Sequence, residues 1–168
     1  MSEVRQVDEP SDAATIERAH RLANEAMHMV ALQHRRVRTE EPEDRAFAFR
    51  WWADLQFLVI SLRRLRLAAV LATKHQASRA AVKRAVETFD EVLPSLRRMR
   101  NIGEHIDEYA IEKGHDRQVD RRQLEVGAFD GTTFEWLGGR LNIDEGLAAG
   151  ESLCRAVRDA HSAQVKSS

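Results

Sequence analysis

Apolar residues recur at intervals of three and four positions along most of this chain, which is the spacing of one face of an α-helix. The first stripe runs from Ala13 to about Arg38. The polar residues 1–12 before it are predicted to form a flexible leader. A second and more apolar stripe follows an acidic, proline-containing segment and ends near Thr73. We therefore predict two long helices in the first half of the chain.

A third stripe, beginning after Ser78, is interrupted by Pro94. Proline inside a helix costs about 3 kcal/mol, because it removes one backbone hydrogen bond and clashes with the preceding turn. The sequence therefore predicts either a kink near Val92 or a new helix with Pro94 in its first turn. This second piece is expected to continue to about Lys113 and to end at Gly114.

The segment after these helices is rich in glycine, threonine and aromatic residues, and its central feature is Asp130-Gly131. Asp-Gly between two apolar runs is the strongest short-range signal of a β-hairpin. We predict a small two-stranded hairpin over about residues 123–137, with Gly138-Gly139 as a turn. An isolated hairpin is marginally stable, so this one must pack on the helices.

The last helix is expected to begin at a capping box formed by Asn142 and Glu145. Together these elements predict an all-α fold, an up-and-down bundle of four to five helices with a small β-hairpin before the last helix. Residues 13–165 are predicted to form this single domain.

Composition agrees with one soluble domain. The 168 residues are 43% hydrophobic and 32% charged, and 26 basic against 27 acidic side chains give a net charge of -1. Cys154 is the only cysteine, which excludes an internal disulfide and fits a reducing compartment. The most apolar run, residues 55–62, is far shorter than the roughly 20 residues of a membrane span. The chain is therefore predicted to be cytoplasmic and not bound to a membrane.

The candidate chemistry lies in the segment after Pro94, where Arg100 and His105 are separated by four residues and Asn101 directly follows the arginine. This pattern resembles the Arg-x4-6-His motif of the HEPN superfamily, whose members are all-helical and in many cases metal-independent endoribonucleases. A polar residue, commonly asparagine, often follows the arginine in that family. Tyr109 departs from the pattern, because many HEPN toxins place a tyrosine two residues after the histidine and here it is four.

RNA cleavage by attack of the 2′-hydroxyl on the adjacent phosphorus needs a proton shuttle and a cation. A histidine titrates near neutral pH and typically contributes ~10²- to 10⁴-fold to the rate. An arginine stays charged and can bind phosphate oxygens through two N–H groups. His105 is therefore the predicted proton shuttle, Arg100 the phosphate ligand and Asn101 an orienting group, with no cofactor and no metal.

A dimer face is predicted from the helical phase of the motif. At 100° per residue, Ile102, His105 and Tyr109 lie together, nearly opposite the apolar stripe of the preceding helix. Apolar side chains on such a face favour a partner surface, and Gly103 would allow close approach of backbones. The HEPN resemblance likewise implies a homodimer, and a role in growth arrest or defence with an antitoxin-like protein partner.

Basic residues are concentrated around the motif. Residues 45–113 hold 13 basic and 8 acidic side chains, and residues 61–86 hold seven basic and no acidic ones. Such a surface can attract the RNA backbone. The predicted RNA-binding residues are Arg63, Arg64, Arg66, Lys83, Arg84, Arg97 and Arg98. The alternative is an ordinary solvated helix face.

The competing function is a non-catalytic helical module that dimerises or docks a protein through Ile102, His105 and Tyr109. In that case Arg100 pairs with Glu104 one turn away, and neither motif residue performs chemistry.

Two Glu-x-x-His pairs, Glu17/His20 and Glu25/His28, have the spacing of di-iron carboxylate bundles. Both lie on the first predicted helix, whereas those sites need the pairs on different helices, so no metal site is predicted. The remaining histidines, which lack a partner at motif spacing, are expected at the surface; they are His34, His75, His115 and His161.

Overall fold

The computed structural model describes residues 10–45, 49–124 and 127–167. These residues form six α-helices, two short 3₁₀ helices and three strands. The helices are α1 (Asp12–Arg38), α2 (Phe49–Ala72), α3 (Arg79–Val92), α4 (Leu96–Glu104), α5 (Ile106–Ala110) and α6 (Ile143–Ser167), with the 3₁₀ helices η1 (Pro42–Arg45) and η2 (Arg121–Leu124). The strands are β1 (Gly127–Phe129), β2 (Thr133–Trp136) and β3 (Gly139–Asn142). A mainly helical chain with strands before the last helix is confirmed. The leader predicted over residues 1–12 lies mostly outside the described residues.

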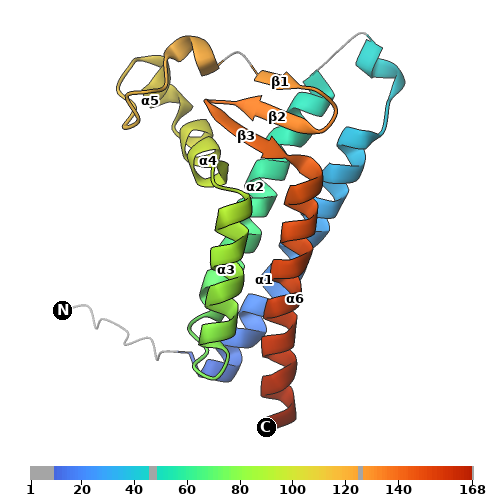
Figure 1. Ribbon diagram of the computed structural model, residues 1–168, viewed down its shortest axis with the longest axis vertical. Coiled ribbons are helices and arrows are strands. Elements are labelled where there is room, and N and C mark those ends of the chain that lie inside the picture. The colour runs from blue at the N-terminus through green and yellow to red at the C-terminus, as the bar shows by residue number, and fades with distance from the viewer. Residues whose placement is uncertain (1–9, 46–48, 125–126, 168) are drawn as a thin grey trace, which may run out of the picture.

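The four long helices α1, α2, α3 and α6 pack along one another (Figure 1). In Figure 1, α1 and α3 run towards the sheet and α2 and α6 run away from it. The predicted apolar stripes face the core, and α1 buries Ile16, Ala19, Ala23 and Val30. Among the described helices, none is both long and apolar enough to cross a membrane.

The third predicted stripe is divided into three helices. The break at Pro94 is confirmed, because α3 ends at Val92 and α4 begins at Leu96. The single helix predicted from there to Lys113 is wrong. His105, with φ −107° and ψ 32°, ends α4 and precedes the five-residue helix α5. Gly103, a poor helix former, lies two residues before this break.

The predicted two-stranded hairpin is part of a three-stranded antiparallel sheet with the order β1-β2-β3. The Asp130-Gly131 turn is confirmed, and Phe129 pairs with Phe134 across it. The third strand was not predicted. Its turn is formed by Leu137 and Gly138, both with positive φ (53° and 69°). Such a pair matches the right-handed twist of the flanking strands.

Aromatic side chains join the sheet to α2. Trp52 lies edge-on to Phe134 and Trp136, with ring centroids 5.5 and 5.7 Å away. The ring also lies against Gly127, where a Cβ atom would be 2.0 Å from Trp52 Cη2. The sheet is therefore fixed over the beginning of α2, beside α4, and forms one end of the molecule (Figure 1).

Candidate functional site

A cleft of about 440 Å³ opens beside α4, α5 and the loop that follows them. It contains two of the three predicted catalytic residues, His105 and Asn101. It also contains a second histidine, His115. The complete lining is Arg98, Asn101, Ile102, His105, Tyr109, His115 and Asp116.

His105 lies at the break between α4 and α5, and 56% of its side chain is exposed. Its Nδ1 is 3.3 Å from Oε1 of Glu108, three residues further along. A carboxylate that accepts the Nδ1 proton orients the ring and leaves Nε2 for a substrate. The geometry therefore places a carboxylate beside an accessible imidazole.

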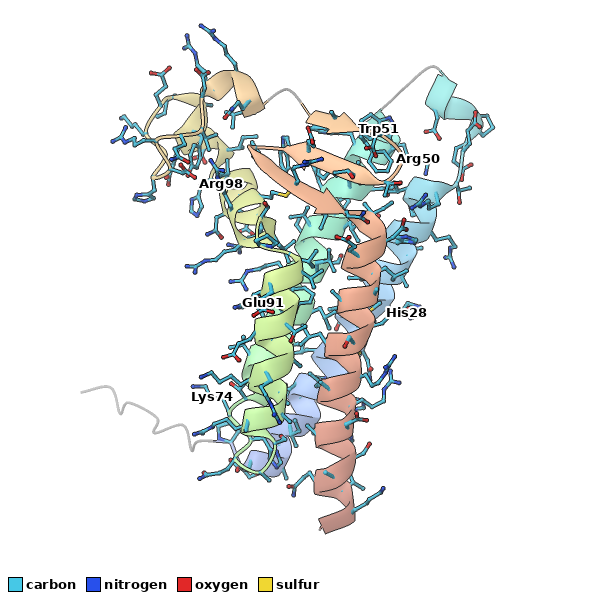
Figure 2. All side chains as sticks on the ribbon, viewed as in Figure 1. His28, Arg50, Trp51, Lys74, Glu91 and Arg98 are labelled. Atoms are coloured by element: carbon cyan, nitrogen blue, oxygen red, sulfur yellow. The ribbon has the colours of Figure 1, made fainter. Side chains whose placement is uncertain are left out.

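One wall of the cleft is held by a polar network centred on Asp116. Arg98 Nε donates to Asp116 Oδ2 at 2.8 Å, and Arg98 Nη1 donates to the Gly138 carbonyl in the sheet at 3.2 Å. The Asp116 backbone N–H donates to the Tyr109 hydroxyl at 3.0 Å. Figure 2 labels Arg98 on α4, beside the sheet. This network fixes the loop that carries His115.

The loop passes close to α5 at Gly114, where a side chain would not fit. A Cβ atom at Gly114 would lie 2.3 Å from Cδ1 of Tyr109. The glycine predicted to end a helix therefore allows the chain to fold back against the tyrosine ring.

Arg100, the predicted phosphate ligand, does not line the cleft. Its guanidinium forms an ion pair with Glu104, as the non-catalytic alternative predicted, and Nη1 donates to Asn101 Oδ1 at 3.2 Å. About 30% of its side chain is exposed. Arg100 is therefore connected to the cleft through Asn101.

An arginine cluster lies on the other side of Arg100. It consists of Arg63 and Arg66 from α2 and Arg97 and Arg100 from α4, and their charges act on one another. Arg66 forms a two-point pair with Asp90, with Nε–Oδ1 and Nη2–Oδ2 distances of 2.5 Å. The cluster therefore combines three of the predicted RNA-binding residues with the motif arginine.

Arg63 is the unusual member of this cluster. Its Nε and Nη1 atoms are buried and have no hydrogen-bond partner among the described residues. Burial, followed by the charges of Arg66, Arg100 and Arg97, lowers the pKa of Arg63. Buried donors without acceptors are costly, so the position of Arg63 is unfavourable for the stability of the fold.

The other predicted RNA-binding residues lie apart from one another. Arg98 belongs to the cleft wall. Arg64 lines a separate groove between α1 and α2, together with Leu22 and Met29. On α3, Lys83 pairs with Glu87 at 3.7 Å and Arg84 is exposed.

The prediction that Ile102, Gly103 and Tyr109 form an exposed dimer face is wrong. Ile102 is 1% and Tyr109 is 7% exposed, and both pack into the core of the chain. A Cβ atom on Gly103 would lie 3.1 Å from Cη2 of Trp136, so this glycine faces the chain's own sheet. The break at Pro94 changes the phase of α4 relative to α3 and turns this face inward.

Of the histidines predicted at the surface, His115 is exposed, as predicted, whereas His75 is not. His115 lines the cleft, and His75 is buried, with Nδ1 2.7 Å from Ser78 Oγ and Nε2 2.9 Å from Gln164 Oε1. Ser78 thus bonds His75 rather than capping α3 with its side chain. The sequence offers no spacing signal for either contact, whereas Glu108 could have been found from its i+3 relation to His105.

No protein-family model matches the chain, and comparisons with curated proteins and with solved structures give no match.

Proposed function

We propose that this protein is a metal-independent endoribonuclease of HEPN type that acts at the cleft between α4, α5 and the following loop. The observation that carries the proposal is the placement of His105, Asn101 and His115 in one open cleft. A 2′-hydroxyl attack needs one group that accepts a proton and one that donates a proton, and two histidines can fill these two roles.

The proposed reaction uses His105 as the base. Its Nε2 accepts the proton of the 2′-hydroxyl while Glu108 holds the Nδ1 side of the ring. The 2′-oxygen forms a bond to the adjacent phosphorus, and the bond from phosphorus to the 5′-oxygen breaks. His115 donates its proton to that oxygen. The products are a 2′,3′-cyclic phosphate and a free 5′-hydroxyl.

The amide of Asn101 and the arginine cluster supply the polar surroundings of the phosphate. Asn101 already accepts a hydrogen bond from Arg100, so an RNA phosphate at the amide lies next to a guanidinium. We place the adjacent phosphates along Arg63 and the exposed Arg97, whose positive charges attract an anion.

The proposal includes a homodimer, as the HEPN resemblance implies. With Ile102 and Tyr109 in the core, the exposed apolar residues near His105 are Ile106 and Ile111, which are 42% and 62% exposed. Light scattering at micromolar protein concentration is expected to give the mass of two chains for the native protein and of one chain for Ile106→Glu. A monomeric mass for the native protein would contradict this part of the proposal.

A non-catalytic docking module is the second candidate, and the ion pair between Arg100 and Glu104 favours it. In this pair the motif arginine is already neutralised within its own helix.

The two candidates differ in their effect on an RNA backbone. Matched single-stranded oligonucleotides with ribose or 2′-deoxyribose are incubated with the protein and EDTA. Cleavage of the ribose form alone, with a 2′,3′-cyclic phosphate end, supports the nuclease. Intact RNA would exclude the nuclease and leave the docking module.

A further inference from the structure

The first Glu-x-x-His pair of α1 acquires a third partner in the structure. Glu17 and His20 lie one turn apart on α1, and α6 places His161 against both. One ligand atom from each of these three residues lies within 4.8 Å of the other two. His161 thus adds a ligand from a second helix, which the Glu-x-x-His spacing on α1 alone could not provide.

The three side chains already contact one another. His161 Nε2 is 2.5 Å from Glu17 Oε2, and the rings of His20 and His161 stack with centroids 4.2 Å apart and an angle of 15°. Among the described residues, no third ligand joins the second pair, Glu25 and His28, and His28, labelled in Figure 2, lines a different hollow. The two pairs thus have equal spacing and different surroundings.

The hydrogen bonding of His20 leaves a lone pair on Nε2, as a metal ligand needs. Its Nε2 is 2.9 Å from Asn24 Nδ2, which can only donate, so Nε2 must carry a lone pair. The orientation of that amide is fixed in turn by Cys154, whose Sγ donates to Asn24 Oδ1 at 3.7 Å.

We propose that Glu17, His20 and His161 bind a divalent transition-metal ion, with zinc as the best match. Two imidazoles and a carboxylate form a typical zinc ligand set, with a fourth position open to water. Ligand atoms around tetrahedral zinc are about 3.3 Å apart, so metal binding requires the two stacked rings to turn until their nitrogens face a common point. The positive charge of Arg158 acts on His20 and opposes the cation.

The bound ion would connect the beginning of α1 to the end of α6. These two segments lie side by side at the end of the molecule opposite α5 and the sheet (Figure 1). The metal site is therefore distant from the proposed nuclease cleft. Its expected effect is to stabilise the helical packing, because a ligand that binds only the folded state raises stability.

The test is a titration of the untagged full-length protein with Co²⁺, whose visible absorption reports tetrahedral coordination, followed by displacement with Zn²⁺. The native protein is expected to saturate at about one ion per chain. His161→Ala and His20→Ala are expected to weaken binding by roughly 10- to 100-fold or more. His28→Ala, a matched control from the second Glu-x-x-His pair, should bind like the native protein.

A second readout guards against variants that fail to fold. Zn²⁺ should raise the melting temperature of the native protein and of His28→Ala but not that of His161→Ala, with circular dichroism confirming that each variant is folded. Absence of saturable Co²⁺ absorption in the native protein would overturn the proposal. Equal affinity in His161→Ala would do so as well.

Discussion

His105 Nδ1 lies 3.3 Å from Glu108 Oε1, across the break between α4 and α5. In a single straight helix these residues would also be neighbours, but the break ends α4 at the histidine and leaves 56% of its side chain exposed. The pair therefore places a carboxylate beside a solvent-accessible imidazole, an arrangement that suits a general base.

Glu108→Gln tests whether the carboxylate positions the base. The variant should lower the cleavage rate by about tenfold, less than the ~10²- to 10⁴-fold expected for loss of a general base. Asp107→Asn, an exposed neighbour with the same charge change, is the control. If Glu108→Gln cleaves RNA at the native rate, the carboxylate of Glu108 does not position the base.

Arg63→Met separates stability from RNA binding. Removal of two buried donors without acceptors should raise the free energy of unfolding by about 1 kcal/mol, measured by urea denaturation. The same change should weaken RNA binding and reduce the slope of log affinity against log salt by about 1. Arg155→Met on the exposed face of α6 should alter neither quantity. A less stable variant with native RNA affinity would contradict the anion-binding role of the cluster.

Much of the helical fold could be predicted because local periodicity determines it. The stripe of α1 is regular, and the residues that it predicted to face inward are buried. The phase of α4 could not be predicted, since it depends on how far the break at Pro94 rotates the chain. That rotation decides whether Ile102 and Tyr109 face a partner or the core. The third strand was missed because Leu137 is not a usual residue at a left-handed turn position.

The contacts of the candidate site that the sequence indicated are local ones. His105, Asn101 and the Arg100–Glu104 pair lie within one or two turns. Arg98 and Asp116 are 18 positions apart and His161 and Glu17 are 144 apart. Such contacts depend on how helices and loops pack, and no spacing rule reports them.

The lowered pKa of Asp44 predicts that the fold loses stability in acid. Arg50 Nε donates to its Oδ1 at 2.9 Å and the Glu41 N–H donates to its Oδ2 at 2.8 Å. These bonds lower the pKa of Asp44 to about 2. A carboxyl with a lowered pKa in the folded state stabilises the fold above its unfolded pKa of about 3.9, and that contribution disappears as the pH falls towards 2.

Asp44→Asn should therefore be less stable than the native protein at neutral pH and nearly equal to it at about pH 2. Chemical denaturation at a series of pH values measures this difference, with the exposed Asp159→Asn on α6 as the control. A difference that stays constant across the series would show that the ionised carboxylate of Asp44 does not stabilise the fold.

The most direct test of the nuclease is the initial rate of single-stranded RNA cleavage in EDTA by four proteins. These are the native chain, His105→Ala, His115→Ala and the distant control His28→Ala. The proposed cleft predicts equal rates for the native chain and the control, and losses of roughly 10²- to 10⁴-fold for the other two. Equal rates for all four folded proteins, or no cleavage by the native chain, would contradict it.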